Sequence, residues 1–490
     1  MPTQRFNNFK LYTVLTGILL FTGSCSEYFN LTPPDGLVLD EYWKTKEDVE
    51  ATLMGAYQQF AKMDENLFLY GEIRADLIIQ DNNTPADQRN IISGNIFATN
   101  SLCYWGDFYK IINHCNNVVK YAPEVLKIDK TFTEFKMEAF MSEAIFLRSL
   151  AYFYLVRIFK DVPYVLEPSD NDNVNFFPPK TSGKEILSNI KSDLKEVRLK
   201  IPTTYNTIEE IKGRATQAAV DALLADICLW NFEYDECLTY ANNVLNTNSY
   251  FLQPSSKWFE LFFPGNSLEG IFELQFDSQN GQSNSLYQNT YVLNYYEAST
   301  YAMDILFPLL SQEIIRGRGS ISSESKGYKI WKYCGGAPDQ NTVRPGSISG
   351  SCNFIIYRYA DILLIKAESL SQLGRYDEAL TLINEIRRRA LMEEVNSQNT
   401  PESFEDLILI ERAKEFAFEG KRWFDLLRMG RRNNFARKKK LIEIIVQNVP
   451  STQKLVIASK LTDPDGWYLP VSSSELESNP NLVQNPFYAN

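Results

Sequence analysis

The sequence contains a single histidine, His114, in 490 residues. Metal centres and Ser-His-Asp or Cys-His catalytic sites draw on histidines clustered with cysteines and carboxylates. We therefore expect no metal, no cofactor, and a His114 that is only a half-buried polar residue of a helix. A Gly-rich phosphate loop is also missing, and the S-x-x-K match at Ser323–Lys326 lacks the companion K-T-G of acyl-enzymes.

Basic charge and long apolar runs are scarce as well. The chain has 49 Lys and Arg against 61 Asp and Glu, a formal net charge of −12. Nucleic-acid binding needs a basic face, so we expect no nucleic-acid partner. We interpret the basic run Arg431–Lys440 as a solvated helix end or loop, with phosphate binding as the alternative. Beyond the N-terminus, apolar runs such as Ile362–Ile365 are too short to cross a bilayer.

The N-terminus has the order of an export signal. Arg5 and Lys10 precede the apolar run Leu11–Phe21, and the small residues Thr22–Ser24 lead to Cys25. A cysteine at this place indicates a bacterial lipoprotein, in which the thiol is acylated and becomes the new N-terminus. We therefore predict a signal peptide at 1–24, lipid attachment at Cys25 and an anchored linker at 25–40. An ordinary cleaved signal with an incidental cysteine is the alternative.

Cysteine is also sparse after the signal. Six cysteines in so long a chain do not make a disulfide scaffold. Cys228 and Cys237 fall in predicted helices and are expected to pack as small apolar side chains. Cys334 and Cys352 flank a Gly- and Ser-rich loop, and whether they form a bridge stays open.

Helical periodicity dominates what is present. One predicted helix, Phe135–Phe159, is apolar nearly all round, which is typical of a central buried helix. The predicted helices are Glu47–Met63, Trp105–Tyr121, Phe135–Phe159, Gly183–Leu199, Thr216–Trp230, Tyr234–Leu245, Tyr359–Leu373 and Tyr376–Ala390.

The last four of these helices form two matching hairpins. Ala225 is followed nine residues later by Tyr234, and Ala367 is followed nine residues later by Tyr376. Small residues at matched points let two helices approach closely, and the aromatic residue fills the turn. This spacing resembles tetratricopeptide repeats. The two hairpins are not contiguous, so a simple solenoid is not expected.

Two stretches have a different composition. Residues 250–352 and 79–104 are rich in Gly, Ser, Asn and aromatic residues, and only short strand-like runs such as Ile271–Phe276 occur. Long ordered loops tend to carry function. With 27 tyrosines in the chain, some must lie at the surface. We expect one compact domain, with an N-terminal helical part at 41–249 and a C-terminal part at 250–490 that carries the loop-rich insertion 250–352.

Carboxylates are abundant enough to keep one enzymatic alternative open. A glycosidase needs only two acids at the right separation. Glu411, Glu415 and Glu419 form a stripe on one helix face, which is unfavourable unless cations intervene. Arg412, Arg422 and Arg428 are near in sequence, and Arg387–Arg389 could reach across. We interpret the stripe as a structural ion-pair network rather than a catalytic site.

Several motifs together resemble the SusD/RagB family of outer-membrane nutrient-binding lipoproteins. The resemblance covers essentially the whole mature chain. It departs from the family at two positions, Lys160 and Phe487, where the family usually has Gly. The matching segments are the lipobox with Cys25, Tyr42–Thr45, the spacing of Trp105, Tyr109, Ile112 and Asn116, Arg148–Tyr154 with Asp161–Pro163, Glu411–Arg412 with Glu419–Leu426, Leu469–Pro470, Asn479–Pro480 and Gln484–Tyr488.

The resemblance implies a mainly α fold on a scaffold of four tetratricopeptide-like units. It also implies a lipid-anchored, non-catalytic protein on the cell surface that caps a SusC-like TonB-dependent transporter and delivers glycans, or peptides in some members. A sugar ring exposes an apolar face to aromatic rings and hydroxyls to amides. We therefore expect ligand contacts from the two irregular stretches, at Asn82, Asn83, Arg89, Asn100, Tyr104, Tyr295, Tyr296, Tyr328 and Trp331.

Overall fold

The computed structural model describes residues 42–171, 174–308, 313–324, 327–396 and 400–489. The predicted signal peptide 1–24, the lipid-attachment residue Cys25 and the linker 25–40 lie outside these residues. The chain divides into Met1–Lys44 and one compact unit, Thr45–Asn490.

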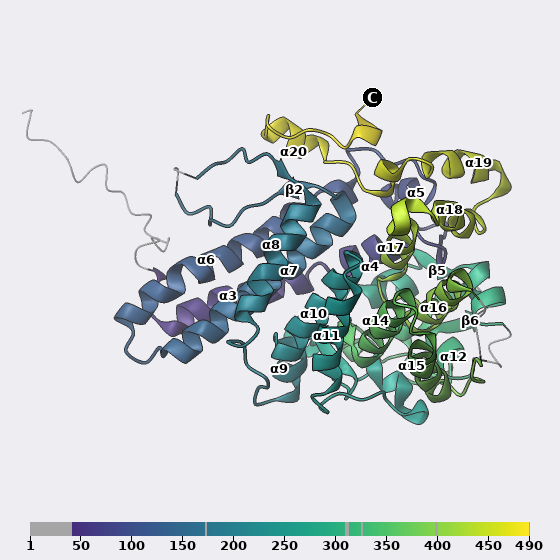
Figure 1. The fold of residues 1–490 in the computed structure, drawn as a ribbon, viewed down its shortest axis with the longest axis horizontal. Helices are drawn as coiled ribbons and strands as arrows, with labels where there is room; N and C mark the ends of the chain where they lie inside the picture. The colour runs from purple at the N-terminus through teal and green to yellow at the C-terminus, as the bar shows by residue number, and fades with distance from the viewer. Residues whose placement is uncertain (1–41, 172–173, 309–312, 325–326, 397–399, 490) are drawn as a thin grey trace, which may run out of the picture. The chain divides into compact units, whose positions relative to one another are not determined.

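The N-terminal half of the unit is built from helices, as predicted (Figure 1). Most begin at a Ser or Thr whose hydroxyl accepts a hydrogen bond from a backbone N–H of the first turn, as Thr45 does for α3. The helices are α3 (Lys46–Ala61), α4 (Asp64–Glu72), α5 (Ala86–Ile92), α6 (Gly106–Ile128), α7 (Glu134–Phe159), α8 (Gly183–Val197), α9 (Ile208–Gly213), α10 (Gln217–Trp230) and α11 (Tyr234–Leu245), with a 3-10 turn η2 (Ser101–Cys103).

The C-terminal half has two short helices, α12 and α13, within the loop-rich insertion and a second group of helices after it. These are α12 (Arg316–Ser320), α13 (Trp331–Cys334), α14 (Tyr359–Gln372), α15 (Tyr376–Arg389), α16 (Pro401–Glu415), α17 (Arg422–Phe435), α18 (Lys438–Val446), α19 (Ser451–Lys460) and α20 (Ser473–Ser478). Short 3-10 and π turns are η3 (Ser255–Leu261), η4 (Ser278–Asn280), η5 (Gln288–Val292), η6 (Ala302–Leu306), η7 (Gly346–Ile348), η8 (Pro464–Trp467) and η9 (Pro486–Tyr488).

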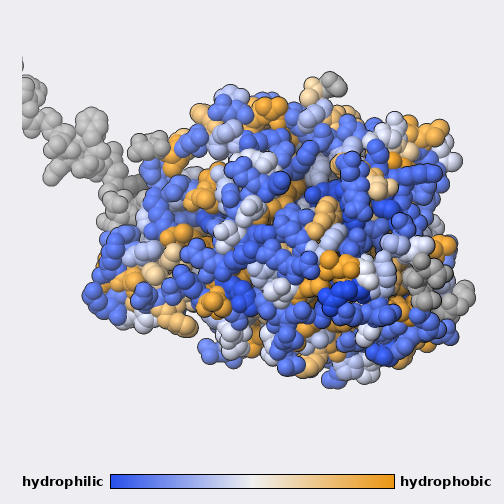
Figure 2. Space-filling model, viewed as in Figure 1, coloured by the Kyte–Doolittle hydropathy of each residue, from blue (hydrophilic) through white to orange (hydrophobic). Residues whose placement is uncertain are grey.

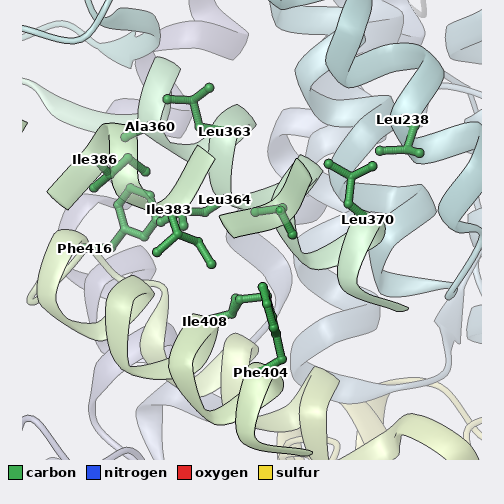
Figure 3. Close-up of a cluster of buried hydrophobic side chains, with 12 residues drawn as sticks. Leu238, Ala360, Leu363, Leu364, Leu370, Ile383, Ile386, Phe404, Ile408 and Phe416 are labelled. Atoms are coloured by element: carbon green, nitrogen blue, oxygen red, sulfur yellow. The ribbon is translucent and has the colours of Figure 1, made fainter. Parts of the chain in front are cut away.

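The two predicted hairpins are confirmed as α10–α11 and α14–α15, and α11 packs against α14. Ala367, Ala379 and Ile383 are fully buried where the second pair meets. Figure 3 shows this core, in which side chains from α14 and α15 meet those of α16 and Leu238 of α11. Burial of such apolar side chains stabilises the fold by roughly 1.5–3 kcal/mol each.

Helix α7 is the central helix that its composition predicts. It packs against α6, α8 and α3, and most of its side chains are buried. Among the described residues, α7 is the one helix long and apolar enough to cross a membrane, but 89% of that apolar window is buried inside the protein. Its apolar side chains therefore serve the core.

The strands are short and occur in antiparallel pairs. β4 (Gly270–Leu274) pairs with β8 (Phe354–Arg358). This pairing brings the early part of the loop-rich insertion next to the segment that follows it. β1 (Ile78–Gln80) pairs with β5 (Tyr296–Ala298), and β6 (Ile321–Glu324) pairs with β7 (Gly327–Ile330) in a hairpin beside β5. β2 (Val162–Pro163) pairs with β3 (Lys180–Thr181).

Lys160 ends α7 with a positive φ of 71°. This region of backbone space is unfavourable for a residue with a Cβ, which explains why glycine is the usual residue here. The Lys160 ammonium donates to Asp465 at 2.7 Å. The turn therefore keeps the conformation that favours glycine while carrying a side chain that links α7 to the C-terminal segment.

The three glutamates lie in a buried ion network, as predicted, but they do not share one helix face, because α16 ends at Glu415 and Glu419 lies in the turn that follows. Each carboxylate has at least one cation within 3 Å; Arg316 bonds Glu411, and Arg358 bonds both Glu415 and Glu419. Of the cations expected nearby, Arg387 and Arg389 take part, whereas Arg412, Arg422 and Arg428 pair with other acids. The buried ion network comprises Glu269, Glu313, Glu411, Glu415, Glu419, Arg316, Lys332, Arg358, Arg387, Arg389 and Lys414.

The interpretation of Arg431–Lys440 as solvated is wrong for part of the run. Arg432 is buried and pairs with Glu368 and Glu405, and Arg437 also pairs with Glu405 at 2.9 Å. Residues 433–436 and Lys439 are exposed as expected; the Lys439 side chain is 91% exposed. The composition of the run gave no sign of these acids, because α14 and α16 supply them from a distance in sequence.

The cysteines of the described chain are buried thiols. Cys228 and Cys237 pack within the α10–α11 hairpin, as predicted. The bridge left open between Cys334 and Cys352 is not formed: the Cys334 thiol donates to the carbonyl of Ile330 at 3.5 Å, and the Cys352 thiol donates to that of Phe262 at 3.1 Å.

Glu72 of α4 provides a prediction about pH. One of its carboxyl oxygens accepts from the backbone N–H groups of Gly420 and Lys421, and the other has no protein partner in the described chain. Burial raises the pKa of Glu72 to about 8. Between the unfolded pKa near ~4.3 and 8, the unfolded chain loses a proton that the folded protein keeps. The stability contributed by the protonated carboxyl is therefore lost as pH rises through this window.

We expect Glu72→Gln to become progressively more stable than the wild type from pH 5 to pH 8, by on the order of 3 kcal/mol. The amide oxygen of Gln can still accept from Gly420 and Lys421. Urea unfolding at several pH values measures the difference. Glu124→Gln, at a residue whose side chain is 58% exposed, is the matched control and should show a flat difference. A difference for Glu72→Gln that does not change with pH would contradict the assignment.

Candidate functional site

The two irregular stretches meet in the structure. Residues 78–84 lie beside 293–298 because β1 pairs with β5, with Gln80 opposite Tyr296. The pairing continues past the strands: the Asn83 amide donates to the carbonyl of Leu293 at 3.1 Å, and the Thr84 hydroxyl donates to that of Tyr295. The segments 81–84 and 293–297, together with β7, form one continuous surface, which we call the junction surface.

A polar cluster underlies the junction surface. The Asn294 side-chain N–H group donates to Asp81 at 2.9 Å and to Glu297 at 2.8 Å, while its carbonyl oxygen accepts from the Lys329 ammonium. Lys329 is buried, and Asn294 has a φ of 52°, a left-handed conformation that asparagine tolerates. Charged and amide groups are thus fixed from three distant parts of the chain, which positions the neighbouring Tyr295 and Asn83.

Several of the predicted ligand residues are accessible at this surface. Asn82, Asn83 and Arg89 are exposed, and Tyr295 and Tyr328 are half-buried. The Arg89 guanidinium donates to the carbonyl of Thr84 at 2.7 Å, which holds it against the same loop. Figure 2 shows one face of the molecule as predominantly hydrophilic, with apolar residues in small scattered groups.

Tyr104 and Asn100 belong to the far end of the first stretch, around η2. Tyr104 is 42% exposed, whereas Asn100 is buried. The Asn100 side chain caps η2 by accepting from the N–H of Leu102, and it donates to the carbonyl of Asp87 at 2.8 Å. Both hydrogen-bonding ends of this amide are occupied, so Asn100 shapes the loop rather than facing a ligand.

Two of the aromatic residues expected at the surface are in the core instead. Trp331 and Tyr296 have no exposed area. The Trp331 indole N–H donates to the carbonyl of Ala337 at 2.7 Å, and Tyr296 packs against Phe68. Both lie in polar, Gly-rich sequence that resembles a surface loop, but this loop folds back onto α4 and buries its larger rings.

Asp81, Asn294, Glu297 and Lys329 were not identified from the sequence. Each is a common polar residue without a motif around it. They come together only because β1 pairs with a strand more than two hundred residues later. The acidic residues among them, Asp81 and Glu297, contact the same amide and so form one carboxylate pair with which the glycosidase alternative can be tested.

Comparison with known families decides the classification. The SusD family profile matches residues 230–488, and a second profile, described as starch-binding associating with outer membrane, matches residues 33–229. The chain belongs to the SusD/RagB family. The two matches cover nearly the whole chain, and the predicted resemblance is thereby confirmed, together with the mainly α fold.

Individual relatives are similar along their entire length. The SusD-like protein P38 of Formosa agariphila is 25% identical over 99% of this chain and 100% of its own. Among solved structures, surface glycan-binding protein A from Bacteroides uniformis has a TM-score of 0.72 at 21% identity, covering 90% of this chain and all of its own. A laminarin-binding SusD-like protein has a TM-score of 0.71 at 20% identity, covering 91% and 100%. These structures share the SusD fold with this chain.

Proposed function

We propose that this SusD-family protein binds glycans at the junction surface without turning them over. The observation that carries the proposal is the meeting of the two irregular stretches, which places accessible tyrosines beside amides and a guanidinium. An aromatic ring that covers one sugar face removes apolar area from water at about 25 cal/mol per Å², and the amides hydrogen-bond the hydroxyls. Two structural neighbours, a laminarin-binding SusD-like protein and a surface glycan-binding protein, support this ligand class.

Tyr295→Ala combined with Tyr328→Ala should weaken glycan binding by about tenfold or more, since each ring contributes about 1 kcal/mol of apolar contact. Both rings are only half-buried, so the thermal unfolding midpoint should hardly move. Isothermal titration with laminarin and starch oligosaccharides measures the affinity. Phe176→Ala, at an aromatic that is 57% exposed elsewhere, is the matched control and should bind as the wild type does.

An unchanged affinity in the double variant would contradict the use of this surface. Tight binding of peptides in place of glycans would redirect the proposal to the peptide-binding members of the family. Tyr104→Ala, made separately, tests whether the ligand extends to η2.

The Asp81–Glu297 pair favours a glycosidase as the second candidate, because a retaining enzyme needs two carboxylates close together. Incubation with the same glycans and an assay for new reducing ends separates the two functions. Turnover that is lost in Asp81→Asn and Glu297→Gln would replace the binding proposal. The shared Asn294 amide, which holds both carboxylates as hydrogen-bond acceptors, supports binding.

We further propose that the protein is anchored by a lipid on Cys25 to the outer face of the outer membrane, where it caps a SusC-like TonB-dependent transporter. The order of charged, apolar and small residues before Cys25 and the outer-membrane description of the family support this. Co-purification with an outer-membrane transporter after mild detergent extraction tests the partner. Absence of any such partner would contradict the delivery role.

Cys25→Ala should move the protein from the membrane to the soluble fraction and abolish incorporation of labelled fatty acid, because several acyl chains are needed for stable anchoring. Fractionation and labelling in the native cell measure both. Ser26→Ala is the matched control and should remain in the membrane. Retention of Cys25→Ala in the membrane, with labelling intact, would contradict lipidation at this residue.

A further inference from the structure

A cavity of about 320 Å³ lies beside β1 and α5. Its walls come from β1, α5, the turn between α18 and α19, and the C-terminal η9; α5, α18 and α19 lie together at the upper right of Figure 1. Apolar side chains form most of the lining, including Ile78, Ile91, Ile445 and Ile457. At the ~30 Å³ that one water occupies in the liquid, the cavity has room for about ten non-hydrogen atoms.

Two cations line this apolar cavity, and among the described residues no Asp or Glu lines it. The Arg74 guanidinium stacks on the ring of Trp423 at 4.4 Å and donates to the carbonyls of Gly466 and Trp467, both at 2.6 Å. The Lys460 ammonium donates to the carbonyl of Gly94 at 2.7 Å and to Asn95 at 3.0 Å. Neither forms an ion pair with any carboxylate within 42–171, 174–308, 313–324, 327–396 and 400–489.

The charge of this lining differs from that of the chain as a whole, which carries an excess of acids. The buried Arg316, Arg358, Arg422 and Arg428 pair with carboxylates, whereas the buried Arg344 and Lys212 donate to backbone carbonyls, as Arg74 does. Removing a cation from water is costly unless an opposite charge compensates. Arg74 and Lys460 are half-buried and have carbonyl and amide partners, and an anion bound from outside the chain would complete their charge compensation.

We propose that the cavity is a binding site for a small monocarboxylic acid with an apolar body. The aliphatic side chains would enclose the body, and Arg74 and Lys460 would hold the carboxylate. Gln453, Ile457 and Lys460 face the cavity from one side of α19, which brings the ammonium and the apolar wall to the same ligand. The site is separate from the junction surface and does not depend on the glycan proposal.

The test uses 3-phenylpropionate, 3-phenylpropan-1-ol and 3-phenylpropylamine, three probes with the same apolar body and a different head. Isothermal titration of the full-length protein should show the carboxylate binding at least tenfold more tightly than the alcohol and the amine. Lys460→Gln should weaken carboxylate binding severalfold. Lys454→Gln, on the same helix but outside the lining, is the matched control and should leave it unchanged.

Arg74 also holds the Gly466–Trp467 backbone, so a substitution there could disturb folding. Val449 is half-buried and lines the cavity. Val449→Trp, which would fill the cavity, is therefore a second and independent variant. It should abolish carboxylate binding while the affinity for glycans stays the same. Equal affinity for the three probes, no carboxylate binding at millimolar concentration, or carboxylate binding that survives Val449→Trp would each overturn the proposal. Loss of glycan binding by the Tyr295 and Tyr328 variants bears only on the junction surface.

Discussion

Replacing Arg358 with methionine is expected to destabilise the protein by about 4 kcal/mol or more. The guanidinium has no exposed area and lies at the centre of the buried ion network. Its nitrogens donate to Glu269 and Glu415, both at 2.6 Å, and to Glu419 at 3.0 Å. Methionine has a similar length but no charge, so three buried carboxylates would lose one shared cation.

The lowered pKa of Glu419 supports a large loss of stability in Arg358→Met. Arg358 and Lys332 hold the pKa of Glu419 at about 2, well below its usual range, despite the opposing effect of burial. Urea unfolding of Arg358→Met against the wild type measures the loss. Arg375→Met, which breaks the pair with Glu378 where the two side chains are 47% and 56% exposed, is the matched control and should change stability far less, because solvent screens an exposed ion pair. Equal effects of the two variants would contradict a stabilising role for the network.

Trp331→Ala is expected to cost about 3–5 kcal/mol, the range for truncating a large buried aromatic side chain. The ring has no exposed area, and its N–H donates to the carbonyl of Ala337. A Cβ added at Gly335 would lie only 2.3 Å from the indole nitrogen, so the surrounding turn is packed closely against the ring. Truncation would leave a cavity and an unsatisfied carbonyl in the same place.

Thermal unfolding and denaturant titration of Trp331→Ala measure this loss. Trp331→Phe should recover part of it by refilling the cavity without restoring the hydrogen bond. Phe135→Ala, at a ring that is 73% exposed, should change stability by less than about 0.5 kcal/mol. A Trp331→Ala protein with native stability and weakened glycan binding would contradict this. It would instead place the ring at the ligand, as the composition of the stretch 250–352 predicts.

The helices that periodicity predicted are placed closely, whereas α4, α5, α9, α12, α13 and α18 to α20 were not predicted. Tyr234–Leu245 was predicted to the residue, and α7, α8, α10, α14 and α15 deviate by at most two residues at either end. Over the length of these helices, apolar residues at intervals of three and four indicate an α-helix and no other element. The predicted start at Trp105 was one residue early, and α6 continues to Ile128, because Pro123 lies inside the helix without ending it.

The loop-rich insertion could not be predicted in the same way. Its strands are at most five residues long, and β4 and β5 pair with segments far away in sequence. Nothing in the sequence around Tyr296 or Trp331 distinguishes a ring that covers the core from one that faces solvent. The distinction depends on the pairing of β1 with β5, which periodicity does not report.

The most specific family motif, Glu419–Leu426, turns out to have structural roles throughout. Lys421 pairs with Asp361, Arg422 pairs with Asp76, and Trp423 stacks under Arg74. Gly420 has a φ of 71°, and its carbonyl lies 1.7 Å from where a Cβ on Gly71 would be, so the two backbones touch. A motif whose residues all hold the scaffold identifies the fold without identifying a ligand.

The buried cysteines can be used to detect local or global unfolding of the protein. Burial raises the pKa of Cys103, Cys115 and Cys237 to about 12, so at neutral pH these sulfurs are neither accessible nor ionised while the chain is folded. A short pulse of an alkylating reagent would therefore mark only those molecules that have opened, and mass spectrometry would count them. Because the labelled positions lie in η2, α6 and α11, the same pulse would show whether distant parts of the scaffold open together or one at a time.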